Sequence, residues 1–358
     1  MGCLLPSQGV AADLVFTGNL RFATKTFIHV RLADGRVIDA GLPKTGPLAA
    51  EAILGQYKIA DQVQITCKTV SADLDPTVDY PHSLELKQIR FLRAPTPDEV
   101  AGVNASLSWK AGENLLKPSS VAPAPKPPAP AVPKEFEQIR PVNLEYLSNL
   151  PNFIADEVAV RIHKPKGSDK WKEKDTIESE VAFTGRFTTR EHIRFNGKPY
   201  NKPTHWLPGG PTWGVGFGED LRPVFDPDCE NEVTFEGRKD VGGVQLRSFA
   251  FRTPMDGCFG PGLTNYQFFN AGKAGRFLVD DADNVIQMEH HQVGMPADMG
   301  AGSTYVLKWG NVKIGDAVHL LPIAEDWTWI TADGETWHAT ATFKNHRHFE
   351  STINIKFQ

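Results

Sequence analysis

Residues 118–133 read PSSVAPAPKPPAPAVP, with seven prolines and four alanines in sixteen positions. Proline fixes φ and lacks a backbone N–H, so this run can join neither a helix nor a central strand. Its natural conformation is extended polyproline II, which at about 3.1 Å per residue spans up to roughly 50 Å. The stretch therefore predicts a linker at 118–133 between a module at 1–117 and a larger module at 134–358.

Composition and charge are ordinary for a globular protein and disfavour a nucleic-acid partner. Hydrophobic residues make up 41% of the chain and charged residues 23%, with a net charge of −5. Residues 1–118 hold 12 basic and 12 acidic side chains, and residues 136–358 hold 24 basic and 30 acidic ones. Neither module has the basic excess that binding to a phosphate backbone requires. No apolar run of eighteen residues occurs, so we expect no transmembrane helix.

The first module has the pattern of a small β-barrel. Residues 13–33 alternate as two strands, and Asp34-Gly35 is a hairpin signal before a third strand. A short helical stretch at 47–57 is followed by strands at 61–70 and 83–93. Three strands, a helix and two strands is the element order of an OB-type Greek-key barrel. Another small β-barrel is the alternative, and an OB-type binder of oligonucleotides is disfavoured because the module lacks a basic face.

The second module begins with the strongest helix candidate of the chain, at 134–150. Pro141 is expected to divide it and leave Asn143–Leu150 as the firmer part, which Pro151 ends. From Phe153 onward the pattern alternates with period two over about ten strands, which predicts a large antiparallel sheet with one buried face. The predicted fold is mainly β: a small OB-like barrel plus a large curved antiparallel sheet, or half-barrel, with one packed helix.

Several stretches of the second module resemble a group of uncharacterised bacterial envelope proteins that are abundant in acidobacteria. They are YLSNLPNFIADEVAVRI (146–162), GFGEDLRPVF (216–225), HLLPI (319–323) and FKNHRHFESTINIKF (343–357). The resemblance covers about 140–358 and implies a LolA/LolB-like lipoprotein-carrier architecture, in which a helix lies in the concavity of a half-barrel. It also implies an envelope location, an apolar cavity and no catalytic residues.

The chain departs from that group in one respect. The group often has a cysteine two residues after the phenylalanine of LPNF, and this chain has Ala155 there. A disulfide from that strand is therefore impossible.

A cavity on the concave face is expected to be lined by apolar strand residues and capped by a glycine-rich loop at 208–220. The same residues are also natural core residues. The predicted ligand-binding set is Phe153, Val158, Val160, Phe183, Trp206, Trp213, Phe217 and Phe249.

Three late histidines are the candidates for a metal site, although we expect neither a metal nor a cofactor. His346 and His348 are two residues apart, so on a strand they share a face, and His338 is a possible third ligand. The alternative is that they face solvent, opposite Phe343 and Phe349. No catalytic motif occurs, because the glycine-rich loop lacks the ending of a phosphate loop and GxSxG is absent.

The four cysteines bear on the compartment. Cys229 and Cys258 lie in loop-like contexts 29 residues apart, and we predict that they form a disulfide, which implies an oxidising compartment. Cys67 lies in a strand-like run and is expected to be a buried thiol. No intact signal peptide precedes Cys3, which is either the remnant of a lipid-anchored start or an ordinary terminal cysteine.

The leading hypothesis is a non-enzymatic, exported envelope protein, either periplasmic, attached to the outer membrane or extracellular. Its partner would be an apolar ligand, such as a lipid or lipoprotein, or another envelope protein. One alternative is a structural subunit that self-assembles through sheet edges and is bridged by the linker. Another is a metal-dependent enzyme that uses the C-terminal histidines.

Overall fold

The computed structural model describes residues 13–69, 84–105, 114–126, 130–184, 188–201, 217, 220–254, 262–264, 267–269, 272–295, 302–331 and 333–348. The chain divides into two compact units. One contains residues 1–128 together with 260–270, and the other contains 129–259 and 271–358. The mainly β fold predicted from the sequence, with a small sheet and a large antiparallel sheet, is confirmed.

The first unit is built on five strands with two helices. Its sheet follows the order β3-β2-β1-β4-β5, and a parallel pairing of Gly41 with Glu85 joins β3 to β5. This pairing closes the sheet on itself, as in a small Greek-key barrel, whereas the assignment to the OB type stays a prediction. The elements are β1 (Leu14–Ala23), β2 (Phe27–Leu32), β3 (Arg36–Gly41), α1 (Ala50–Gln56), β4 (Gln62–Thr69), β5 (Leu84–Arg93) and α2 (Pro97–Ala105).

The turn between β2 and β3 forms where the sequence predicts it. Gly35 has a φ of 87°, and its N–H donates to the carbonyl of Leu32 at 3.1 Å. Glycine reaches this left-handed conformation without a steric penalty, which explains why Asp34-Gly35 is a hairpin signal. The turn sets the register that buries Ile28, Val30 and Ile38 in the core of the barrel.

A hairpin from the second half of the sequence extends the first sheet. It consists of β12 (Gly262–Thr264) and β13 (Gln267–Phe269). β13 pairs antiparallel with β3, with Phe268 opposite Val37. The small sheet therefore has seven strands, of which two come from a distant part of the chain.

Both ends of the Pro/Ala-rich stretch are attached to folded structure. The N–H of Ala124 donates to the carbonyl of Pro97 at 2.9 Å, and Val121 packs against Val100 and Val103 of α2. At the other end Val132 packs against the core of the second unit. The residues predicted as a linker thus contribute contacts to each unit.

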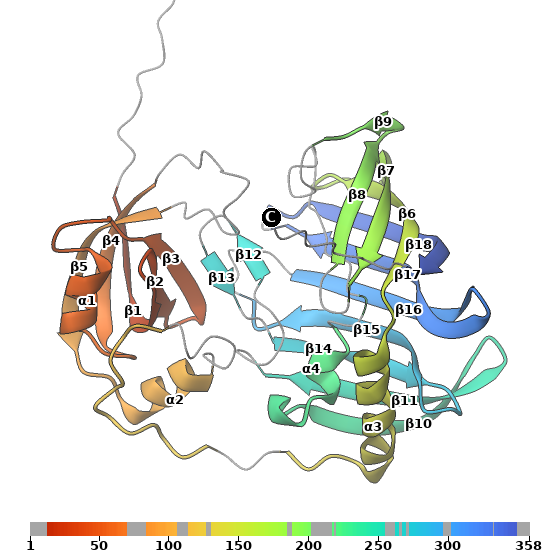
Figure 1. The fold of residues 1–358 in the computed structure, drawn as a ribbon, viewed down its shortest axis with the longest axis horizontal. Coiled ribbons are helices and arrows are strands. Elements are labelled where there is room, and N and C mark those ends of the chain that lie inside the picture. Colours follow the sequence, from red (N-terminus) through yellow and green to blue (C-terminus); the bar gives the residue numbers. More distant parts are fainter. Residues whose placement is uncertain are drawn as a thin grey trace, which may run out of the picture. The chain divides into compact units, whose positions relative to one another are not determined.

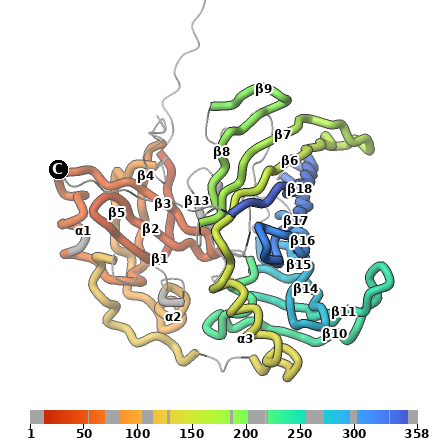
Figure 2. Tube along the Cα trace, turned by 45° about the vertical axis from the view of Figure 1, so that its right-hand side comes forward, coloured from red at the N-terminus to blue at the C-terminus, as the bar shows by residue number. Residues whose placement is uncertain are grey.

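The second unit consists of an eleven-stranded sheet with a long helix across one face (Figure 1). Its order is β10-β11-β14-β15-β16-β17-β18-β6-β7-β8-β9, and every neighbouring pair is antiparallel. The last described strand, β18, returns to lie beside β6 in the centre of the sheet (Figure 2). The helices are α3 (Lys134–Asn149), α4 (Arg222–Phe225) and the 3-10 turn η3 (Pro227–Cys229). The strands are β6 (Phe153–Lys164), β7 (Lys172–Phe183), β8 (Thr188–Phe195), β9 (Lys198–Pro199), β10 (Glu232–Val241), β11 (Val244–Thr253), β14 (Gly272–Val279), β15 (Val285–Val293), β16 (Gly302–Ile314), β17 (Ala317–Ile330) and β18 (Thr336–His348).

Helix α3 is continuous, so the expectation that Pro141 divides it is wrong. Pro141 lies on the exposed side of the helix. Water can satisfy the carbonyl one turn earlier that loses its intrahelical donor, so the helix passes through the proline. The opposite side buries Phe136, Ile139 and Leu147 against the sheet.

A buried amide attaches α3 to the sheet. Asn143 is 2% exposed, and its Nδ2 donates to the carbonyls of Ile139 at 2.8 Å and Asp283 at 2.9 Å. Its Oδ1 accepts from the N–H of Val285 at 3.2 Å. One side chain therefore satisfies two backbone groups of the turn between β14 and β15.

We predict that Asn143→Ala lowers the free energy of unfolding by about 2–4 kcal/mol, because the backbone groups of Asp283 and Val285 lose their partner. Chemical denaturation followed by tryptophan fluorescence measures the change. Asn149→Ala, at the exposed end of the same helix, is the control and should change stability by less than about 0.5 kcal/mol. Equal effects of the two substitutions would contradict the role given to Asn143.

Candidate functional site

One face of the eleven-stranded sheet is buried, and we call it the inner face. On β6 it carries Phe153, Ala155, Glu157, Ala159 and Arg161, each at most 1% exposed. Successive residues of a strand point to opposite faces of the sheet. The residues directly opposite these five on the neighbouring strands therefore also point to the inner face. Helix α3 packs on this face at the end of the sheet that holds β10, β11, β14 and β15 (Figure 1).

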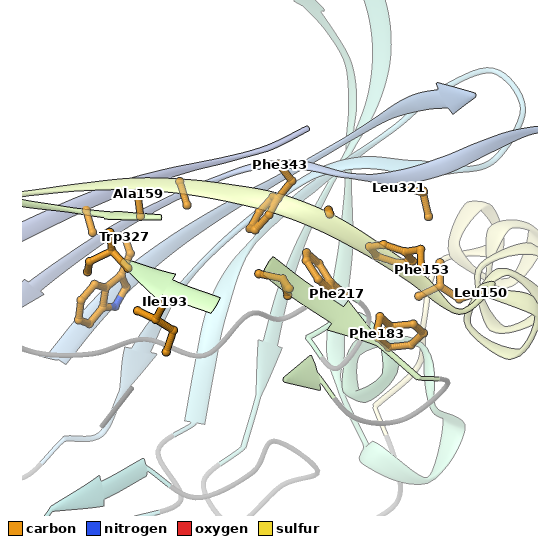
Figure 3. Close-up of a cluster of buried hydrophobic side chains, with 14 of the residues drawn as sticks. Leu150, Phe153, Ala159, Phe183, Ile193, Phe217, Leu321, Trp327 and Phe343 are labelled. Atoms are coloured by element: carbon orange, nitrogen blue, oxygen red, sulfur yellow. The ribbon is translucent and has the colours of Figure 1, made fainter. Parts of the chain in front are cut away.

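The inner face holds two hydrophobic clusters. The first cluster is centred on the rings of Phe153, Phe183, Phe217 and Phe343 (Figure 3). The centroid of the Phe217 ring lies 5.1 Å from that of Phe153 and 5.0 Å from that of Phe343. Phe217 lies outside the strands. Its ring packs among the rings of Phe153, Phe183 and Phe343, which the strands contribute.

The second cluster lies beneath α3 and α4. Phe249 and Phe277 stack with centroids 5.1 Å apart, and Phe136 stacks on Phe225 at 5.3 Å. All four side chains are completely buried. This cluster is packed with protein side chains, as a core is.

The predicted ligand-binding residues fall into three groups. Phe153, Phe183 and Phe217 meet in the first cluster, and Phe249 lies in the second. Val158, which is 43% exposed, and Val160 lie on the opposite face of β6. Trp206 and Trp213 lie outside the described residues.

Val158 and Val160 point away from the inner face because side chains alternate between the two faces along a strand. Val158 lies five positions after Phe153 and Val160 lies seven positions after it, and an odd offset turns a side chain to the other face of a strand. Parity instead brings Glu157 and Arg161 inward. Whether any of the eight residues contacts a ligand stays a prediction.

Two buried ion pairs link strands on the inner face, one between the neighbouring strands β6 and β7 and one from β8 across β7 to β6. Arg161 binds Asp175 through two hydrogen bonds of 2.5 and 2.7 Å, and both side chains are 1% exposed. Arg190 binds Glu157 at 2.6 and 2.8 Å, and Ser179 donates to the same carboxylate at 2.6 Å. Paired and hydrogen-bonded in this way, the charges can lie among apolar side chains.

A third charged group joins the segment before α4 to the sheet. Asp220 Oδ1 lies 2.9 Å from Lys273 Nζ and 3.4 Å from His290 Nε2. Burial raises the pKa of Asp220, but the Lys273 charge and the His290 hydrogen bond outweigh it, so this pKa lies well below its usual range. Burial and the Lys273 charge lower the pKa of His290, which favours the neutral imidazole.

Two tyrosines separate the hydrophobic clusters. Tyr305 of β16 and Tyr146 of α3 pack against both, and each is only half-buried. The cross-strand neighbours of Tyr305 are far less accessible, because His290 is 3% exposed and Trp327 is 4% exposed. Burial raises the pKa of both phenols, so both remain uncharged. The two side chains therefore keep partial exposure between the clusters, although the hydroxyl of Tyr146 is itself buried.

The candidate metal ligands are not brought together. His338 lies on the outer face, with Nε2 3.0 Å from Asp326 Oδ2. A bulge near Asn345, whose φ is 52°, turns His346 inward against Phe153, where Nε2 bonds the carbonyl of Pro322 at 3.1 Å. His348 is exposed at the end of β18. Within the described ranges, no group of three or more His, Cys, Asp and Glu is arranged to hold a metal ion.

The cysteines are described only in part. Cys229 is disulfide-bonded, whereas Cys258 and Cys3 lie outside the described residues, so the Cys229–Cys258 pairing stays a prediction. Cys67 is a buried free thiol, and burial raises its pKa to about 12. In the part of the chain that the structure describes, no helix has the length and apolar character needed to cross a bilayer.

Sequence reasoning missed the polar contacts of the inner face. The missed set is Glu157, Arg161, Asp175, Arg190, Asp220, Lys273, His290, Tyr305 and Glu325. For β6 a signal was present, because Glu157 and Arg161 share the parity of Phe153. For Asp220 and Lys273, which are 53 residues apart, no local pattern predicts the contact.

Comparisons with known proteins give weak structural matches. A putative outer membrane lipoprotein-sorting protein domain from Vibrio parahaemolyticus matches with a TM-score of 0.31 at 10% identity, covering 60% of this chain and 93% of that one. A DUF1329 family protein from Desulfovibrio piger and a LolA superfamily protein from Nitrosomonas europaea match with TM-scores of 0.29 and 0.26, both at 9% identity. Each of these two matches covers 60% of this chain and 94% of the other.

No family model matches the sequence, and no curated protein matches it. Superpositions with these TM-scores do not identify a family, so the resemblance to lipoprotein carriers stays an expectation.

We predict that Phe217→Ala lowers the free energy of unfolding by about 3–5 kcal/mol, because the ring leaves a cavity among three other phenylalanines. Denaturant titration measures the loss. Benzene should bind the new cavity and raise the midpoint of the variant only. Val244→Ala, at a 57% exposed site, is the control. A Phe217 variant as stable as this control would contradict the prediction, because it would show that the surrounding side chains fill the space of the lost ring or that they pack loosely around it.

We also predict that acid destabilises the protein through His290, which lies close to Asp220, Lys273 and Tyr305 and is influenced by the charge of the next residue, His291. Its pKa is lowered below the usual value of 6.5 on folding, so the unfolded chain takes up the proton more readily. The stability that neutral His290 contributes is present above that value and is lost as the pH falls. The unfolding free energy of His290→Gln should therefore decline less between about pH 6.5 and 5 than that of the wild type. The exposed His291→Gln should keep the wild-type slope.

Proposed function

We propose that the second unit binds an apolar ligand, such as the acyl chain of a lipid or of a lipidated protein, on the inner face of its large sheet. The observation that carries this proposal is the pair of half-buried tyrosines between two aromatic clusters. A partly exposed strip between apolar clusters is the kind of surface on which an apolar chain is held, with a few polar groups fixing its orientation. The protein acts as a carrier or binding protein rather than as an enzyme.

We further propose that the protein works in an oxidising compartment of the cell envelope or outside the cell. The disulfide at Cys229 supports this location, because disulfides persist where thiols are not kept reduced. A lipid anchor at Cys3 belongs to the same proposal.

Extraction of the natively purified protein with organic solvent, followed by mass spectrometry, tests the ligand. We expect a lipid or another amphiphile in stoichiometric amount, and we expect that protein stripped of it binds a fluorescent alkyl probe with a change in tryptophan emission. Tyr305→Trp, which fills more of the strip, should reduce this binding. Stripped protein that binds no apolar probe at all would overturn the proposal.

A further inference from the structure

The hairpin that joins β6 to β7 carries a dense group of lysines. Residues 164–174 read KPKGSDKWKEK and contain five lysines and two carboxylates, which gives a net charge of +3. The rest of 136–358 holds 19 basic and 28 acidic side chains. The hairpin is therefore a positive region in a module that is otherwise negative. Four of its five lysines are exposed, and they are Lys166, Lys170, Lys172 and Lys174.

The register of the strands shows that this hairpin projects from the sheet. β18 pairs with β6 only as far as Lys164, and β8 pairs with β7 only from Ile177 onward. Among the described residues, the part of the hairpin from 165 to 174 therefore has a neighbouring strand on neither side. Figure 2 shows β6 and β7 running together to this tip.

The tip of the hairpin is a defined turn. The N–H of Ser168 donates to the carbonyl of Pro165 at 3.0 Å, and Gly167, with a φ of 72°, has the positive φ that a type II turn requires at its third residue. Ser168 Oγ then accepts from the N–H of Lys170 at 3.2 Å. The turn thus holds the lysines of both arms together at one end of the sheet.

Carboxylates at this end of the sheet leave the lysine charges largely uncompensated. In the described part of the chain, no carboxylate oxygen lies within 4.0 Å of the four exposed ammonium groups. The adjacent β17–β18 turn contributes Asp333 and Glu335. Glu335 Oε2 lies 3.1 Å from His163 Nε2, and a hydrogen bond from Thr331 together with the Lys166 charge lowers the pKa of Asp333. Even with these two carboxylates counted, the net charge of the tip stays positive.

An exposed tryptophan lies among the lysines. Trp171 is 42% exposed, and Lys164 Nζ lies 5.3 Å from the centroid of its ring. Tryptophan is enriched where a protein meets the head groups of a bilayer, because its ring has an apolar body and one polar N–H. Lysines alone suit any polyanion. Lysines on both sides of an exposed indole suit an anionic lipid surface, which offers phosphate groups and an apolar layer beneath them.

We propose that the β6–β7 hairpin docks the protein on the surface of a bilayer that contains anionic phospholipids. The lysines contact the phosphate groups, and the ring of Trp171 enters the head-group region. Each lysine near such a surface strengthens binding by about fivefold, so three net charges strengthen it by on the order of a hundredfold. The docking is therefore reversible. The inference concerns a surface apart from the inner face and does not require a ligand there.

Sedimentation of the full chain with lipid vesicles tests the inference. One set of vesicles is phosphatidylcholine alone, and the other is equal parts of phosphatidylcholine and phosphatidylglycerol. We expect tighter binding to the second set, and added salt should weaken it. Lys170→Gln combined with Lys172→Gln should lower the affinity by about tenfold or more. Trp171→Ala should also lower it.

A matched pair of lysines provides the control. Lys313→Gln combined with Lys344→Gln removes two exposed lysines from the opposite end of the sheet and changes the net charge by the same amount. This variant should bind the vesicles as the wild type does. All of these substitutions are at exposed sites, so the midpoints of unfolding should stay close to that of the wild type.

Three results would overturn the inference. The wild type could fail to prefer the anionic vesicles, or the two double variants could bind them equally. Soluble polyglutamate could also bind as tightly as the vesicles with Trp171→Ala changing neither, which would identify an acidic polypeptide as the partner. The Lys170 and Lys172 variant should still bind the fluorescent alkyl probe, so failure of the docking surface is distinguishable from failure of the proposed function.

Discussion

The second unit depends on the requirement that one face of an eleven-stranded antiparallel sheet be covered. Alternation over so many strands produces an apolar face much larger than one helix can shield. Helix α3 covers the end that contains β11, β14 and β15, and its Asn143 joins it to the turn between β14 and β15. Phe217, which is not part of the sheet, covers the region of β6, β7 and β18. The half-buried Tyr146 and Tyr305 lie between the part of the face that α3 covers and the part that Phe217 covers.

Buried charges on the inner face determine register as well as polarity. Arg161 and Asp175 lie directly opposite each other on β6 and β7, and Glu157 lies opposite Ser179 on the same two strands. A slip of one residue would turn these groups to the outer face and separate them. Apolar residues of similar volume would tolerate such a slip better. Buried ion pairs contribute little net stability, so their contribution here is the choice of one strand alignment.

The sequence predicts the elements better than it predicts their faces. Alternation from Phe153 onward, the turn at Asp34-Gly35 and the helix at 134–150 all correspond to observed structure. Hydropathy selects Val158 and Val160 as cavity residues, whereas strand parity, which is a stronger constraint, turns them outward. Pro141 shows that the helix-breaking tendency of proline can also mislead. The proline lies on the solvent side of α3, and the packing of the other side against the sheet keeps the helix continuous. The bulge that turns His346 inward has no clear sequence signal, since Asn345 is not a glycine.

The position of the β12–β13 hairpin in the sequence affects how the first unit folds during synthesis. The five strands of the small barrel are complete at Arg93, but the hairpin that covers the outer edge of β3 begins at Gly262, about 170 residues later. At typical rates of synthesis of about 5–20 residues per second, this edge stays unpaired for roughly 10–30 seconds. Open strand edges are templates for pairing with other chains. During synthesis, the unpaired edge of β3 is therefore a place where chaperone binding would prevent pairing with other chains until the β12–β13 hairpin has been made.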